Sequence, residues 1–104
     1  MNLNISFRHI EPDELTKTFV QEKSQTLKRY FEGKISVTWI LSSERQNRIA
    51  HCHLVGNSMD YFGEGSTDDL KASIGMALDK IEKQLRKHKE IVKDHLHKNR
   101  LPTT

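Results

Sequence analysis

At 104 residues, with 35% hydrophobic and 30% charged side chains, the chain is long enough for one domain with a modest core and too short for two. It has no apolar run near the roughly 20 residues that cross a bilayer, and no signal-peptide pattern at its N-terminus. Its single cysteine, Cys52, excludes an internal disulfide and favours a reducing compartment, so we expect a cytoplasmic protein.

The N-terminal part predicts a strand followed by a helix. Residues 2–7 alternate between polar and apolar, which is the period of a half-buried strand. A helix should begin near Pro12, because proline suits the first helical position and Asp13 and Glu14 suit the positive end of the helix dipole. Gly33 is the expected C-terminal stop of this helix.

Three strands are expected next, in quick succession. We predict them at residues 34–42, 48–55 and 59–65, separated by a polar turn at 43–47 and a tight turn at 56–58. In the first of these strands, alternate apolar positions would share the core face: Ile35, Val37, Trp39 and Leu41.

A long amphipathic helix is predicted from residue 67 to about residue 97. Ser66 followed by Asp69 resembles a capping box, and Gly75 is either a weak point or a close-packing site. At 1.5 Å per residue the helix would be about 45 Å long and would overhang a domain of this size. Its apolar stripe consists of Leu70, Ile74, Leu78, Ile81, Leu85 and Val92.

The expected order is therefore β-α-β-β-β-α. This is an α+β fold, in which a four-stranded sheet has two helices packed on one face because both amphipathic helices must bury their apolar sides. We expect residues 1–98 to form a single domain and residues 99–104 to form a short flexible tail.

Positive charge is concentrated on the last helix. Residues 80–100 hold eight basic and three acidic side chains, a net of +5, whereas the rest of the chain has a net charge of −2. Such a helix suits a polyanion. Nucleic acid is favoured over an anionic membrane, because the apolar stripe is needed to cover the sheet.

Helical spacing places the basic side chains of this helix in two rows, one on each side of the apolar stripe. One row is Lys80, Lys83, Lys87 and Lys98, and the other is Arg86, Lys89 and Lys93. The first helix adds Lys23, Lys28 and Arg29, with Lys34 just beyond it. Such rows are most often solvated helix faces, but acidic partners for i,i+4 pairs are outnumbered here, which favours phosphate contacts that recognise shape.

Metal binding and catalysis find less support. His51 and His53 lie two residues apart on a predicted strand and share a face, but no third ligand is evident and Cys52 points the other way. On an exposed sheet face, such a histidine pair can also contact RNA or simply contact water. The sequence has no phosphate-binding glycine loop, nucleophile elbow or zinc signature, so we expect no enzyme activity, cofactor or metal.

Several segments match the pattern of a known family. The most specific is the run from Asp79 to Lys89. Weaker signposts are Leu3-Asn-Ile5, Leu27-Lys-Arg-Tyr-Phe31, and Gly65 with Asp69, Ala72 and Ile74. Over about residues 1–95 the chain resembles the ribosome hibernation promoting factors, which include the ribosome-associated inhibitor A type.

The resemblance implies a domain similar to double-stranded-RNA-binding domains that binds the small ribosomal subunit near the decoding region. Family members overlap the mRNA channel and the tRNA sites and silence translation in stationary phase or under stress. Carried over by position, the RNA-binding residues would be Lys23, Lys80, Lys83 and Lys87, joined by Arg86 and Lys89. Thr26 stands where members often have lysine, and Lys28 and Arg29 would compensate for it.

The tail bears on the subtype. Residues 95–104 are short and basic rather than acidic, which indicates the short form that promotes ribosome dimers with a helper protein rather than the form that opposes them. We expect a monomer when free, with no membrane partner and no small-molecule substrate. The alternatives are a general double-stranded-RNA-binding module and a metal-binding or adaptor protein that uses His51 and His53.

Overall fold

A computed structural model describes the backbone of residues 1–100 and the side chains of residues 1–88. Its elements are β1 (Asn2–Arg8), α1 (Glu14–Gln25), a 3-10 helix η1 (Thr26–Tyr30), β2 (Ser36–Glu44), β3 (Asn47–Gly56), β4 (Met59–Thr67) and α2 (Leu70–Arg100). The predicted β-α-β-β-β-α order and α+β class are confirmed. The four strands form one sheet in the order β1-β2-β3-β4, in which β1 is parallel to β2 and the other pairs are antiparallel.

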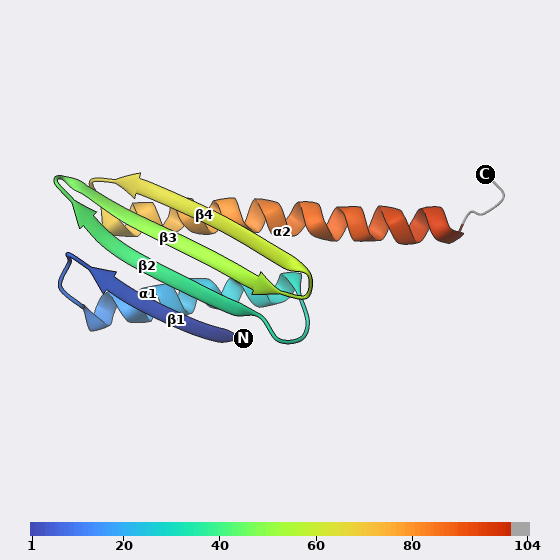
Figure 1. The fold of residues 1–104 in the computed structure, drawn as a ribbon, viewed down its shortest axis with the longest axis horizontal. Helices are drawn as coiled ribbons and strands as arrows, with labels where there is room; N and C mark the ends of the chain where they lie inside the picture. Colours follow the sequence, from blue (N-terminus) through green and yellow to red (C-terminus); the bar gives the residue numbers. More distant parts are fainter. Residues whose placement is uncertain (101–104) are drawn as a thin grey trace.

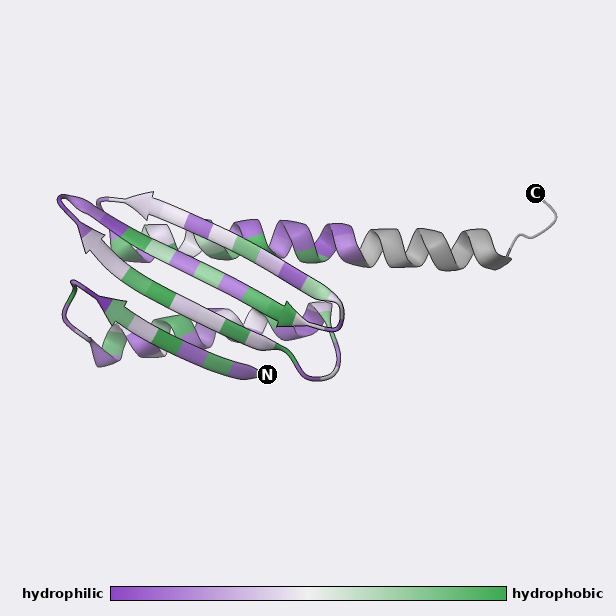
Figure 2. Cartoon of the chain, in the orientation of Figure 1, coloured by the Kyte–Doolittle hydropathy of each residue, from purple (hydrophilic) through white to green (hydrophobic). Residues whose placement is uncertain are grey.

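Both helices lie behind the same face of the sheet (Figure 1). Hydrophilic and hydrophobic residues alternate along β2 and β3 (Figure 2), which is the pattern of a sheet with one covered face and one open face. The predicted apolar positions are all buried: Val37, Trp39 and Leu41 within β2, and Ile35 just before it. The Trp39 Nε1–H donates to the Oγ of buried Ser24 at 2.9 Å, which ties the centre of the sheet to α1.

Two glycines of β4 let α2 lie directly against the sheet. A Cβ added at Gly65 would lie 2.0 Å from the carbonyl oxygen of Ser73, and one at Gly63 would lie 2.4 Å from that of Ala77. Any side chain at either position would therefore push the helix backbone away. By contrast, a Cβ at Gly75 meets nothing within 4 Å. Gly75 is thus not a close-packing site. The other predicted alternative, that Gly75 is a weak point of the helix, remains.

The start of α1 differs from the prediction. Asp13 is the N-cap, because its carboxylate accepts from the Leu15 N–H at 3.3 Å and from the Thr16 hydroxyl at 2.7 Å. These bonds lower the pKa of Asp13, the Thr16 bond most of all. Pro12 therefore precedes the cap and is not the first helical residue. The helix then tightens into η1 well before Gly33, whose φ is +94°.

The start of α2 also needs a correction. Ser66 belongs to β4, so the predicted capping box is wrong. Thr67, the last residue of β4, instead stabilises the turn into α2, since its Oγ1 accepts from the Asp69 N–H at 3.0 Å and lies 2.8 Å from the Oγ of buried Ser73. A serine at capping-box spacing from an acidic residue can equally lie in a strand, and here β4 includes Ser66 and ends at Thr67, before Asp69.

β3 and β4 are longer than predicted, β2 keeps its predicted length but is shifted by two residues toward the C-terminus, and both turns are shorter. β2 runs to Glu44 and β3 begins at Asn47, so the polar turn shrinks to two residues. The next turn lies at Asn57 and Ser58, whose φ values of 50° and 63° are those of the hairpin turn that matches strand twist. Cross-strand pairing thus extended the ladders into polar residues that sequence alone assigns to loops.

The predicted overhang of α2 is confirmed. The helix spans 31 residues, or about 46 Å at 1.5 Å per residue. It projects well beyond the sheet (Figure 1), and the protein measures 59 × 23 × 17 Å. Helical backbone continues to Arg100, whereas residues 101–104 of the predicted tail lie outside the described part of the chain. No helix in the described part is long and apolar enough to span a membrane.

Candidate nucleic-acid interface

α2 divides into a buried stripe and a charged surface, as its spacing predicts. Ile74, Ile81 and Leu85 are fully or almost fully buried against the sheet. The basic side chains on the remaining surface are exposed wherever side chains are described: Lys80, Lys83, Arg86 and Lys87. Lys89, Lys93 and Lys98 lie outside the residues with described side chains.

The predicted row of Lys80, Lys83 and Lys87 is not uniform. The Lys80 ammonium donates to the backbone carbonyl of Glu64 on β4 at 2.6 Å. Lys83 and Lys87 are exposed and make no hydrogen bond or ion pair within the part of the chain whose side chains are described. Lys83 and Lys87 therefore have all their N–H donors available to a phosphate, whereas Lys80 already uses one of its donors on Glu64.

The opposite side of α2 is organised by one carboxylate. The side chain of Glu82 is only 14% exposed, and its Oε2 lies 3.8 Å from Arg29 Nη2 and 3.9 Å from Arg86 Nη1. Glu82 therefore brings a cation of η1 and a cation of α2 to one place. Its single negative charge leaves a net positive charge for the trio.

Thr26 takes part in the same contact. Its hydroxyl lies 3.4 Å from Glu82 Oε1 and donates to the Lys23 carbonyl at 2.7 Å. Thr26 therefore faces α2 and places no positive charge between the helices. Arg29 stacks on the Tyr30 ring at 5.1 Å from its centroid, which orients the guanidinium at the end of η1.

Lys23 shares an aromatic neighbour with a residue that the sequence reading missed. The Phe19 ring has the Lys23 ammonium 5.6 Å from its centroid and the Lys71 ammonium 5.5 Å from it. Lys71 belongs to the first turn of α2, eleven residues or about three helical turns before Glu82. That spacing is the signal that could have placed Lys71 on the side of α2 that faces α1. Lys28 is exposed on η1.

The histidine pair has a structural explanation. His51 and His53 share a face opposite to Cys52, as predicted, and this is the open face of the sheet, where His51 contacts Glu64 and the His53 Nε2 lies 2.5 Å from Asp60 Oδ1. Phe62 lies beside both imidazoles, with ring centroids 5.5 and 6.4 Å away. Among the described residues, no group of three or more His, Cys, Asp or Glu side chains is arranged to hold a metal ion.

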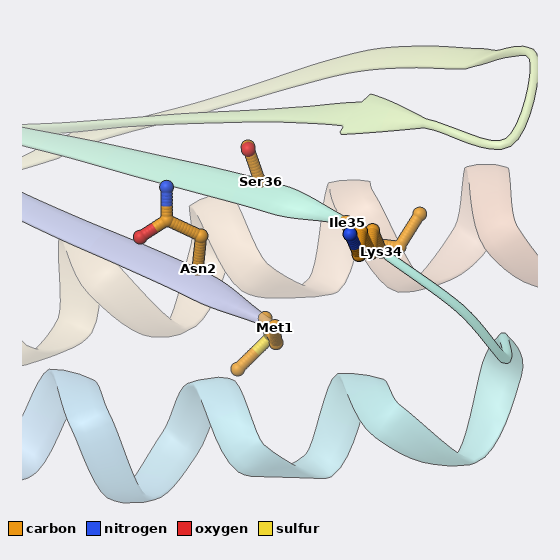
Figure 3. Close-up of a pocket in the computed structure, with 5 residues that line it drawn as sticks. All are labelled: Met1, Asn2, Lys34, Ile35 and Ser36. Atoms are coloured by element: carbon orange, nitrogen blue, oxygen red, sulfur yellow. The ribbon is translucent and has the colours of Figure 1, made fainter.

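The buried Cys52 does not supply a catalytic nucleophile. Cys52 is fully buried, and burial raises the pKa of its thiol to about 12, so the thiol stays protonated at neutral pH. A shallow hollow lies where β1 and β2 begin, lined by Met1, Asn2, Lys34, Ile35 and Ser36 (Figure 3). Among the described residues, no hydrogen bond joins the Ser36 hydroxyl to the Lys34 amine, so the two are not arranged as a nucleophile and its base.

Comparison with known proteins assigns the chain to a family. The family described as sigma 54 modulation protein / S30EA ribosomal protein matches residues 3–93. The chain belongs to this family. It is 32% identical over 95 residues to the ribosome hibernation promoting factor of Salmonella typhimurium and 30% identical to that of Escherichia coli K12, in each case covering 91% of this chain and 100% of the relative.

Solved structures agree with this family assignment. The chain is similar to the N-terminal domain of Protein Y from Thermus thermophilus, with a TM-score of 0.79, 25% identity, and coverage of 85% of this chain and 99% of that one. A ribosomal subunit interface protein from Coxiella burnetii shares the fold, with a TM-score of 0.74, 16% identity, and coverage of 86% and 99%. The family resemblance drawn from the Asp79–Lys89 run is thus confirmed.

Proposed function

We propose that this protein is a ribosome hibernation factor, which binds the small ribosomal subunit near the decoding region through α2 and η1. The observation that carries the proposal is the solvent-facing side of α2, where Lys83 and Lys87 are exposed and have no partner among the described side chains. Arg86 and Arg29 extend this surface toward η1. The names of the relatives from Salmonella and Escherichia support the same function.

The mechanism is steric and needs no chemical step. The cationic side chains replace counterions on ribosomal RNA phosphates, which supplies affinity without reading base sequence. The protein then occupies the space that mRNA and tRNA need, and translation is silenced in the stressed or stationary-phase cytoplasm. The candidate contacts are Lys23, Lys28, Arg29, Lys80, Lys83, Arg86, Lys87 and Lys89, with Lys71 as an addition from the structure.

Charge reversal on α2 tests this proposal. The variant Lys83→Glu/Lys87→Glu should lose co-sedimentation with ribosomes at moderate salt while keeping its fold, because both side chains are exposed. The matched control is Arg8→Glu/Arg45→Glu, which makes the same change in net charge at exposed positions away from α2 and η1. The control should still co-sediment. Retention of the Lys83/Lys87 variant on ribosomes would contradict the proposal.

A general double-stranded-RNA-binding module is the second candidate, because contacts to phosphate alone do not distinguish one duplex from another. Binding to a free RNA duplex as tight as to ribosomes would favour that candidate. We further propose that the protein is monomeric when free and promotes ribosome dimers together with a helper protein. Sucrose gradients of stationary-phase cells with and without the protein test this, since loss of the dimer peak is expected only if dimerisation is promoted.

A further inference from the structure

β4 forms an open edge of the sheet. Among the described strands it pairs with β3 alone, over the nine residues Met59–Thr67. An unpaired strand edge presents a row of N–H and C=O groups that can pair with a strand of another molecule. An edge of this length therefore requires something that prevents such pairing.

α2 places two side chains on this edge. The Lys80 ammonium donates to the carbonyl oxygen of Glu64 at 2.6 Å, and the Gln84 side-chain amide donates to that of Phe62 at 2.9 Å. Phe62 and Glu64 are two residues apart, so their carbonyls point the same way along the strand. These are the carbonyls that an additional strand would need as hydrogen-bond acceptors.

The spacing of the helix matches the spacing of the strand. Residues four apart on a helix, such as Lys80 and Gln84, are separated by about 6 Å along its axis. Residues two apart on an antiparallel strand are separated by about 6.8 Å. Gly63 and Gly65 hold the helix close enough for both side chains to reach the edge.

We propose that the β4 edge is a pairing surface for β4 of a second copy of this chain, and that Lys80 and Gln84 keep it closed. A second copy fits because identical antiparallel edges can pair about a twofold axis. Phe62, which is 54% exposed, would add an apolar contact between the copies. Asp60 and Glu64 flank it and oppose pairing by like-charge repulsion, which salt screens.

The test removes both donors and measures the mass of the protein in solution. Lys80→Ala/Gln84→Ala should self-associate in analytical ultracentrifugation at about 0.5 M salt, where the repulsion between exposed charges is screened. Its weight-average mass should approach twice the monomer mass of 12.1 kDa. The wild type and Lys83→Ala/Lys87→Ala, which loses more charge from the same helix and keeps both donors, should remain monomeric.

A conservative variant and a cross-link separate edge pairing from misfolding. Lys80→Arg keeps a donor at the edge and should stay monomeric. Phe62→Cys added to the Ala/Ala background should form a disulfide between copies, and the same cysteine added to the wild type should not. A natively folded Lys80→Ala/Gln84→Ala variant that stays monomeric would overturn the proposal. If this double variant loses its helical circular dichroism signal, the single variants decide by the same criterion. Ribosomes are absent from the assay, so its outcome is independent of the proposed function.

Discussion

The two sides of α2 carry the same sign of charge and are used differently. Toward β4, Lys80 and Gln84 turn back onto the strand edge. Toward η1, the carboxylate of Glu82 gathers two arginines. Helical spacing places Lys83 and Lys87 between these two sides, and they make neither kind of contact within the described residues. These basic side chains have the same charge and differ in their neighbours. Contacts within the protein therefore distinguish those that stabilise the fold from those that are fully available to phosphate.

The largest expected effect comes from displacing α2, which would disrupt both sides at once. Gly65→Val should lower the free energy of unfolding by about 3 kcal/mol, because its Cβ would overlap the Ser73 carbonyl oxygen. Denaturant unfolding followed by circular dichroism measures the change. Gly75→Ala is the matched control and should raise stability by up to about 1 kcal/mol, since space is open there. A Gly65→Val variant as stable as the wild type would contradict the close approach of helix and strand.

A smaller effect is expected from removing the ion pairs that Glu82 makes with Arg29 of η1 and Arg86 of α2. Glu82→Gln removes the charge that Arg29 and Arg86 share, so affinity for ribosomes should rise about threefold while stability falls by less than about 1 kcal/mol. Filter binding at fixed salt measures the affinity. Glu11→Gln removes an exposed carboxylate from the loop before α1 and should leave binding nearly unchanged. Weaker binding by Glu82→Gln would mean that the ion pairs orient the arginines for RNA rather than compete with RNA phosphates for them.

The smallest effect is expected from Thr26→Lys, which adds a cation beside Glu82. Affinity for ribosomes should rise only about twofold, because the carboxylate of Glu82 partly neutralises the added positive charge. The same filter-binding assay measures it, with Thr18→Lys on the exposed surface of α1 as the control. If Thr26→Lys binds no better than the control, the contact between η1 and α2 is not part of the RNA-binding surface.

Sequence patterns predicted the element order, the buried face of β2 and the apolar stripe of α2 as far as Leu85, because all three depend on local periodicity. Val92, the last predicted member of the stripe, lies outside the residues with described side chains. The helix starts were harder, since the Asp13 cap and the Thr67 turn before α2 rest on bonds that several neighbouring polar residues could have made. The role of Gly63 and Gly65 was invisible, because it depends on which helix crosses which strand. For the same reason, charge spacing grouped Lys80 with Lys83 and Lys87, and only the position of β4 separates them.

The most direct test of the central claim is the salt dependence of ribosome binding. The logarithm of the binding constant should fall linearly with the logarithm of salt concentration, with a slope set by the number of phosphates contacted. Replacing Lys83 and Lys87 with glutamine should make that slope shallower by about two, whereas replacing Lys80 should change it by less than one. An unchanged slope for the Lys83/Lys87 variant would contradict the assignment of this surface to RNA.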